Sequence, residues 1–221
     1  MSKKLVIFGV GEQAEVIQYY FDKHSDYEIA AFTVDGEHVS EDSFWGKPVI
    51  EAEEISQQFS PDTHDAYVAI GYNKLNHLRA EKYHWMKGLG YSLANYISEK
   101  ATVLTDKIGD NVLILEENTI QPFVEVGNNV VLWSGNHIGH HTIIRDHVFV
   151  ASHIVCSGGV DIGEYSFLGV NATLRDHITI GPKNIIGAGA ILLKSTGENE
   201  VYPGKHTDKI EGLEATSLKR I

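Results

Sequence analysis

Five of the twelve histidines fall between residues 137 and 153: His137, His140, His141, His147 and His153. An imidazole changes protonation near neutral pH, so such a cluster suits proton transfer or metal binding. Zinc needs three or four ligands that converge on one point. Because His140 and His141 are adjacent, they lack the separated spacing of a three-histidine zinc site. The sequence therefore predicts a general base and no metal.

A second group of residues that could bind a ligand lies at the N-terminus. Gly9 and Gly11 follow the apolar run 5–8 and precede a helical pattern, which is how a glycine turn brings backbone N–H groups to a phosphate. A second predicted strand, 27–34, ends at Asp35, near the distance at which a dinucleotide fold places its ribose-binding acid. Ala14 stands where the third glycine of that fingerprint would be, which weakens an NAD-binding interpretation.

The second half of the chain repeats every six residues. Cutting after each sixth residue from Ile108 gives fifteen closing positions, of which fourteen are Ile, Val or Leu. The remaining one is Cys156, which we expect to be a buried core residue rather than a catalytic thiol. A period of six is neither helical nor that of a half-buried strand. Short parallel strands separated by turns fit it, with three hexads to each triangular coil.

Residues 18 apart then stack along the axis of the coils. One such column contains Gly109, Gly127, Arg145, Gly163 and Gly181, and we expect its glycines because the turn needs a positive φ. Gly158 lies one coil beyond His140. A further column narrows toward the C-terminus and clears a groove, beside which we expect His140 and Gly158 to lie: Leu115, Trp133, Ala151, Gly169 and Gly187.

The first hundred residues predict a different architecture. Strands are expected at 5–8, 27–34 and 65–72, and helices after Gly11, at 51–59 and at 74–89. Alternating strands and helices imply a small parallel sheet. We expect three segments: an α/β domain at 1–97, a β-helix at 98–195 and a tail at 196–221 that packs on the β-helix. Residues 71–79, which follow the third strand, are expected to help bind substrate.

A truncated Rossmann-like domain followed by hexapeptide repeats resembles the sugar acetyltransferases typified by the bacillosamine-pathway and perosamine N-acetyltransferases, which are similar to sialic acid O-acetyltransferases. The resemblance implies a left-handed parallel β-helix, a homotrimer with acetyl-CoA between neighbouring β-helices, and direct transfer of the acetyl group to a nucleotide-linked deoxyamino sugar. It places the nucleotide-sugar site at Gly9, Gly11, Glu12, Gln13 and Asp35.

The resemblance also implies roles for the repeat residues. His140 aligns with the general base, and the N–H of Gly158 aligns with the donor to the acetyl carbonyl. Contacts to coenzyme A align with Phe149, Gly158, Gly169, Val170, Gly187 and Ala188. Two residues depart from the pattern. His141 stands where relatives often have a glutamate that supports the base, and Phe149 stands where close relatives have a histidine near the thioester.

Composition narrows the remaining possibilities. The net charge of −12 disfavours nucleic acid and anionic lipid as partners. A single cysteine excludes an intramolecular disulfide, and the absence of a long apolar run predicts a cytoplasmic protein without a membrane span. His147 and His153 are expected on the surface or in turns, and His137 to point outward. Two alternatives stay open: a sugar O-acetyltransferase, and a non-catalytic trimeric assembly protein.

Overall fold

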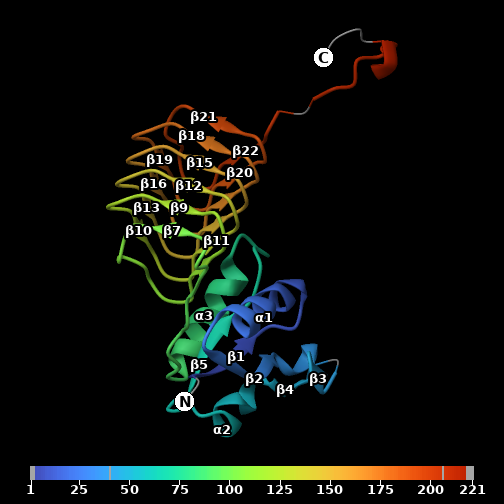
Figure 1. Cartoon of the computed structure of the whole chain (residues 1–221), viewed down its shortest axis with the longest axis vertical. Coiled ribbons are helices and arrows are strands. Elements are labelled where there is room, and N and C mark those ends of the chain that lie inside the picture. The colour runs from blue at the N-terminus through green and yellow to red at the C-terminus, as the bar shows by residue number, and fades with distance from the viewer. Residues whose placement is uncertain (1–2, 40, 206, 218–221) are drawn as a thin grey trace.

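The computed structural model describes residues 3–39, 41–205 and 207–217, and it consists of an α/β domain joined end to end with a column of short parallel strands (Figure 1). Within these residues no helix is both long and apolar enough to cross a membrane. Both parts agree with the predicted fold class, an α/β domain followed by a left-handed parallel β-helix.

The N-terminal domain is a five-stranded sheet with the order β3-β4-β2-β1-β5, parallel except for the edge strand β3. Apolar side chains of β1 and α1 fill its core, including Leu5, Ile7, Ile17 and Phe21, all 1% exposed or less. The strands are β1 (Lys3–Phe8), β2 (Tyr27–Val34), β3 (Ser43–Phe44), β4 (Lys47–Glu51) and β5 (His64–Val68). The helices are α1 (Glu12–His24), η1 (Gly36–His38), η2 (Ala52–Glu54), α2 (Ile55–Gln58) and α3 (His77–Gly88).

The structure differs from the prediction for this domain in two places. The hairpin β3–β4 was missed, because strands this short carry little alternation of apolar and polar residues. The third helix was expected from residue 74 but begins at His77. Residues 74–76 instead have positive φ angles of 51°, 51° and 65°, a left-handed turn that ends the loop after β5.

Strands of two residues each stack into the three faces of the β-helix. The first face contains β6 (Tyr96–Ile97), β8 (Leu113–Ile114), β11 (Val131–Leu132), β14 (Phe149–Val150), β17 (Phe167–Leu168), β20 (Ile185–Ile186) and β22 (Val201–Tyr202). The second contains β7 (Thr102–Val103), β9 (Thr119–Ile120), β12 (His137–Ile138), β15 (Val155–Cys156), β18 (Thr173–Leu174) and β21 (Ile191–Leu192). The third contains β10 (Glu125–Val126), β13 (Ile143–Ile144), β16 (Asp161–Ile162) and β19 (Thr179–Ile180).

The period of six is confirmed by the pairing of the strands. Paired residues along each face are 18 apart, as between Phe149 and Phe167, and the closing aliphatic residues point into the coil. Cys156 is fully buried among them, as predicted, and burial raises the pKa of its thiol to about 12. We call the turn that follows each face by the same ordinal, so that residues 151–153, 157–159 and 163–165 belong to the first, second and third corners.

The glycine column 109, 127, 163 and 181 has a different cause from the predicted one. Positive φ angles occur two residues later, at the third position of each corner, as at Asn129 and His147. The glycines are needed because successive coils lie close together: a Cβ on Gly127 would lie 2.8 Å from the backbone of Arg145. Steric contact between coils, not backbone conformation, therefore explains these glycines.

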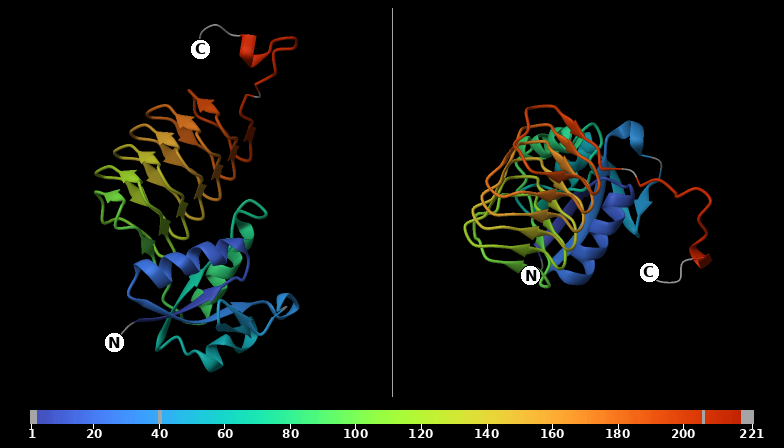
Figure 2. Two further views of the ribbon diagram at one scale, coloured as in Figure 1. Left: turned by 45° about the vertical axis from the view of Figure 1, so that its right-hand side comes forward. Right: turned by 90° about the horizontal axis from the view of Figure 1, so that it is seen from above.

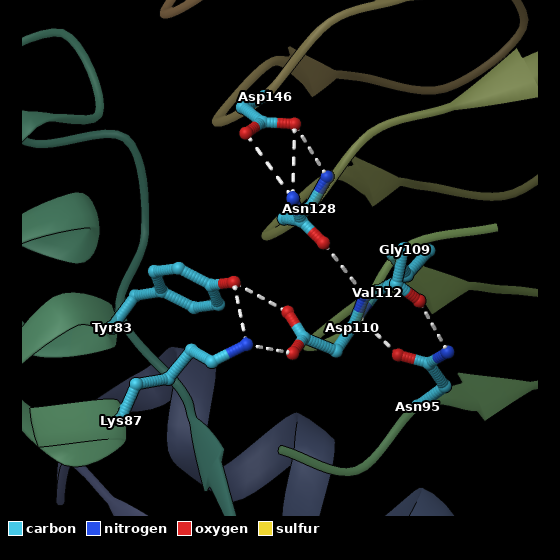
Figure 3. Close-up of polar contacts among 8 residues, drawn as sticks. All are labelled: Tyr83, Lys87, Asn95, Gly109, Asp110, Val112, Asn128 and Asp146. Carbon is cyan, nitrogen blue, oxygen red and sulfur yellow. Dashed lines mark hydrogen bonds and ion pairs between the residues drawn. The ribbon is translucent and has the colours of Figure 1, made fainter. Parts of the chain in front are cut away.

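A ladder of polar side chains at the third corner connects the two domains (Figure 3). Oδ1 of Asp146 accepts a hydrogen bond from the Asn128 N–H at 2.7 Å, and Oδ1 of Asn128 accepts one from the Asp110 N–H at 3.1 Å. The Asp110 carboxylate then accepts hydrogen bonds from Tyr83 and Lys87 of α3. The ladder thus extends the stacking of the coils into the N-terminal domain.

Both ends of the β-helix differ from the predicted segment boundaries. Tyr96–Ile97 already pair with β8, and Val201–Tyr202 still pair with β20, so the β-helix extends beyond 98–195 at both ends. Residues 207–217 are exposed and run away from the coils (Figure 2). They do not pack on the β-helix as expected, and residues 218–221 lie outside the described part.

Candidate functional site

The imidazole of His140 lies directly against Gly158 at the second corner. A Cβ on Gly158 would lie 2.6 Å from Cε1 and 2.8 Å from Nε2 of His140, so only glycine leaves room for the ring. The backbone N–H of His140 donates to Oε1 of Gln121 at 2.9 Å, which fixes the base of the side chain. The stacking rule thus placed His140 and Gly158 together correctly.

His141 is the nearest partner of the His140 ring. Their Nδ1 atoms are 3.0 Å apart, so one of them donates and the other accepts a single shared hydrogen. His141 has a φ of 60°, is exposed, and its ring centroid lies 4.7 Å from that of Phe123. The side chain in contact with the His140 ring is therefore a second imidazole.

The predicted coenzyme A residues gather elsewhere, around a pocket between the N-terminal domain and the first corner. This cavity of about 370 Å³ is lined by Gln13, Tyr72, Trp133, Phe149, Ala151, Ser152, Phe167, Gly169, Val170 and Ala188. Five residues predicted to bind substrate or coenzyme A therefore share one pocket: Gln13, Phe149, Gly169, Val170 and Ala188. Gly187 precedes Ala188 in the chain and stacks in the same column as Gly169.

Within one chain, His140 and this pocket are at different corners. His140 follows β12 on the second face, whereas Gly169 follows β17 on the first face. The sequence-based expectation that His140 lies beside the narrowing groove is therefore wrong for a single chain. Stacking by 18 residues predicts which residues are neighbours along the axis of the coils. It does not predict how far apart two corners of the triangle are.

Phe149 packs inward against the N-terminal domain. Its side chain is 3% exposed, and its ring centroid is 5.1 Å from that of Tyr72 and 5.6 Å from that of Phe167. The sequence suggested that packing replaces the contact of a histidine here, and the geometry agrees. Tyr72 belongs to the segment 71–79 that was expected to help bind substrate, although nothing local in the sequence indicates that this loop reaches the β-helix.

The N-terminal residues predicted to bind nucleotide lie at the carboxyl ends of the parallel strands. Gly9 has a φ of +126°, and a Cβ there would lie 2.8 Å from the Ala69 carbonyl oxygen, so both space and conformation require glycine. Gly11 begins α1, with no neighbouring atom where a Cβ would be. Glu12 is exposed beside it, and the buried Nε2 of Gln13 has no hydrogen-bond partner among the described residues.

Asp35 has a partner that the sequence did not predict. Its Oδ1 lies 2.8 Å from Nζ of Lys82 on α3, and the Lys82 side chain is only 13% exposed. Burial opposes the charge of Lys82, but hydrogen bonds to Asp35 and Glu81 raise its pKa. This lysine adds a cation at the carboxyl edge of the sheet.

The other histidines of the cluster are divided between structural and exposed positions. His147 lies in a turn, one of the two positions expected for it, but it is only 4% exposed and so is not on the surface, because α3 covers the third corner. Burial lowers its pKa to about 4. His153 is exposed in a first-corner turn as predicted, and His137 is half-buried on the second face. Among the described residues no three His, Cys, Asp or Glu side chains converge on a metal position.

Comparison with known families agrees with both halves of this architecture. Residues 4–85 match the PglD N-terminal domain, and residues 107–140 match the bacterial transferase hexapeptide, a model of six repeats. The chain therefore combines a PglD-type domain with transferase hexapeptide repeats, the combination that the sequence resembled.

Solved structures with the same fold cover nearly the whole chain. The acetyltransferase domain of PglB from Neisseria gonorrhoeae aligns with a TM-score of 0.79 and 24% identity over 90% of this chain and 95% of that domain. A variant of perosamine N-acetyltransferase from Caulobacter crescentus, solved with CoA and GDP-perosamine, aligns with a TM-score of 0.79 and 23% identity over 91% and 93%. At this identity the likeness establishes the fold.

Curated relatives match only part of the chain. Acyl-(acyl-carrier-protein)–UDP-N-acetylglucosamine O-acyltransferase of Nautilia profundicola is 26% identical over 57% of this chain and 49% of its own length. The same enzyme of Campylobacter concisus is 23% identical over 39% of this chain and 38% of its own. The chain thus spans half the length of these relatives or less.

Proposed function

We propose that the chain is an acetyl-CoA-dependent N-acetyltransferase that acts on the amino group of a nucleotide-linked deoxyamino sugar. The observation that carries this proposal is that the exposed ring of His140 lies against Gly158 at the second corner. Support comes from related folds: a PglB acetyltransferase domain was solved with acetyl coenzyme A, and a perosamine N-acetyltransferase with CoA and GDP-perosamine.

The chemistry follows from the two groups at that corner. When Nδ1 of His140 donates its hydrogen to His141, the lone pair on Nε2 of His140 is free to accept a proton. His140 then takes the proton from the amine as the amine nitrogen attacks the thioester carbonyl carbon. The Gly158 N–H, which donates to none of the residues described in the structure, stabilises the oxyanion of the tetrahedral intermediate. The C–S bond breaks, and His140 returns the proton to the departing thiolate.

A homotrimer would complete the site. It requires one face of each β-helix that is free to pack against its neighbours, and the three faces differ in this respect. The N-terminal domain covers the lower part of the first face, and the third face carries the ion pairs Lys107–Glu125 and Arg145–Asp161. The outward positions of the second face bear no charge: Thr102, Thr119, His137, Val155, Thr173 and Ile191. Val155 and Ile191 there are 46% and 68% exposed.

If three second faces surround a threefold axis, the first corner of one chain lies beside the second corner of its neighbour. His140 of one subunit then meets the pocket of Gly169 and Ala188 of the next. We propose that the active site forms between subunits in this way, with acetyl-CoA bound in the groove and the sugar nucleotide at Gly9, Gly11, Glu12, Gln13 and Asp35.

Incubating the protein with acetyl-CoA and a panel of UDP-, dTDP- and GDP-linked aminosugars tests the activity, with release of free thiol as the readout. Turnover with an aminosugar and none with its hydroxyl analogue is expected, whereas turnover of the hydroxyl sugar would favour an O-acetyltransferase. If calorimetry detects no acetyl-CoA binding, the chain is a non-catalytic assembly protein instead.

Subunit complementation tests the shared site. His140→Asn and Gly169→Trp should each be inactive alone, the first in the base and the second in the groove. Unfolding and refolding the two together should restore activity, because some interfaces then combine an intact His140 with an intact groove. A sedimentation mass of one chain, or no recovered activity in the mixture, would contradict the proposal.

A further inference from the structure

Arg79, in the first turn of α3, is the largest fully buried side chain among the described residues, with 0% of its surface exposed. Every hydrogen-bond acceptor around its guanidinium is a neutral carbonyl or amide oxygen. Burial lowers its pKa to about 10, which still leaves the group charged at neutral pH. Burying a cation without a carboxylate costs free energy. We therefore expect the hydrogen bonds of Arg79 to hold parts of the chain together in a way that an apolar residue could not.

These hydrogen bonds join the two domains. Nη1 donates to the Gly71 carbonyl at 3.1 Å and to Oδ1 of Asn76 at 2.9 Å, both in the loop after β5. Nη2 donates to the carbonyls of His147 at 2.9 Å and Asn129 at 3.3 Å, both at the third corner of the β-helix. A planar fork of donors suits this role, since it reaches both sides at once.

The loop that Arg79 holds is strained. Lys74, Leu75 and Asn76 are all left-handed, at a cost of about 1–2 kcal/mol per residue, and such a run persists only where its surroundings fix it. The Asn76 side chain contributes by donating to the Tyr165 carbonyl at 2.8 Å. Both ends of the loop 71–76 are therefore tied: Gly71 to Arg79, and Asn76 to both Arg79 and the β-helix.

The same loop supplies one wall of the pocket between the domains. Tyr72 is 56% exposed, and its ring centroid lies 4.8 Å from that of Phe167 and 5.1 Å from that of Phe149. The guanidinium carbon of Arg79 lies 5.6 Å from the Phe149 ring centroid on the other side. Arg79 thus contacts the pocket wall from behind without lining the pocket.

We propose that Arg79 is a positioning residue for the acceptor substrate: it locks the strained loop 71–76 against the β-helix and so holds Tyr72 where the sugar nucleotide passes from the N-terminal domain toward the acetyl group. The proposal rests on the proposed function. It separates two binding events, because Tyr72 lies on the side of the pocket contributed by the N-terminal domain, where the acceptor enters, whereas the coenzyme A residues Gly169, Val170 and Ala188 all belong to the β-helix.

Arg79→Met and Arg79→Lys test the lock, with Lys87→Met as the matched control. Lys87 is also on α3 and also contacts the β-helix, through Asp110, but it does not touch the loop (Figure 3). The KM for the nucleotide aminosugar should rise about tenfold or more in Arg79→Met, while the calorimetric Kd of coenzyme A stays within about twofold of the wild-type value. Arg79→Lys should be intermediate, and Lys87→Met should resemble the wild type in both.

Limited trypsin digestion gives a second readout that does not depend on activity. Lys74 is exposed in the tied loop, so cleavage after Lys74 should accelerate several-fold in the Arg79 variants, while cleavage after the exposed Lys100, outside this loop, should not. If Arg79→Met does not fold, Arg79→Lys and Asn76→Gly replace it. The glycine keeps the left-handed conformation and removes the acceptor for Arg79.

Equal changes in the acceptor KM and the coenzyme A Kd, or uniform acceleration of cleavage at all lysines, would show a purely structural role and overturn the proposal. Unchanged KM and unchanged cleavage after Lys74 would overturn it as well. A wild-type protein without turnover on any aminosugar would refute the proposed function instead, and the cleavage rates would then still decide whether Arg79 locks the loop.

Discussion

The second and third corners of the β-helix have the same backbone but different uses. His141 and His147 occupy the same third position of their turns, with φ angles of 60° and 65°. His141 is exposed, and its ring contacts those of Phe123 and His140. His147 is covered by α3, with its Nδ1 2.9 Å from Nδ2 of Asn129 and its ring near that of Tyr83.

This difference shows that the repeat does not decide which histidine is available for chemistry. The repeat sets the turn, and the docked N-terminal domain then buries one corner and leaves the other open. A neutral, buried His147 with a pKa near 4 serves as a hydrogen-bonding core residue. The open corner retains an imidazole whose ring is held in place by Gly158 and whose Nε2 is free. The following predictions test that division.

Replacing the base at the open corner should have the largest effect. His140→Asn should lower kcat by about 10²- to 10⁴-fold, since the amine then loses its proton acceptor. Coenzyme A should still bind with an affinity near that of the wild type in calorimetry, because the groove residues Gly169, Val170 and Ala188 are unchanged. His64→Asn, in the N-terminal domain, is the control and should keep full activity. Near-normal turnover of the His140 variant would remove this residue from the mechanism.

At the buried corner the corresponding change should affect stability instead. His147→Ala removes the partner of the Asn129 amide and leaves space beneath α3, so the free energy of unfolding should fall by about 2–4 kcal/mol. Urea unfolding followed by circular dichroism measures this loss. Below the melting range kcat should stay within about twofold of the wild-type value. A strong loss of kcat in a fully folded variant would mean that the two corners are not divided as proposed.

Acid should weaken the buried corner through the same histidine. Because the pKa of His147 is about 4 in the folded chain and near 6.5 when unfolded, the unfolded state binds the proton more readily between these values. The contribution is therefore fully present above pH 6.5 and is lost as the pH falls toward 4, by about 2–3 kcal/mol. Urea midpoints at pH 7.5 and pH 4.5 should differ less in His147→Gln than in the wild type. Equal differences would contradict the assignment.

The sequence predicted what repeats locally and missed what packs over it. The hexad period gave the core columns and, through stacking by 18, the pairing of His140 with Gly158. The same rule could not report the separation of the corners, because a column describes one edge of the triangle only. Glycines were placed correctly but for the wrong reason, since close approach of coils becomes visible only when coil spacing is known.

The long-range contacts of α3 follow no sequence period. Arg79 donates to His147, and Lys82 pairs with Asp35, across 68 and 47 residues of sequence. Neither pair follows from spacing, hydropathy or a glycine motif. In the sequence, nothing distinguishes Arg79 and Lys82 from the other residues of a predicted helix. Their burial depends on where α3 packs. Contacts that depend on docking therefore had to come from the structure.

The smallest effect is expected for the polar ladder below the buried corner. Asn128→Ala removes the acceptor of the Asp110 N–H and the donor to Asp146, which should lower the free energy of unfolding by about 1–2 kcal/mol. The exposed third-face pair offers a contrast: Asp161→Asn breaks its ion pair with Arg145 and should cost under about 1 kcal/mol. Urea unfolding of both variants measures the ranking. If the surface pair costs more than the ladder, the stability of the third corner comes from the charged face of the coils rather than from the hydrogen bonds that extend them into α3.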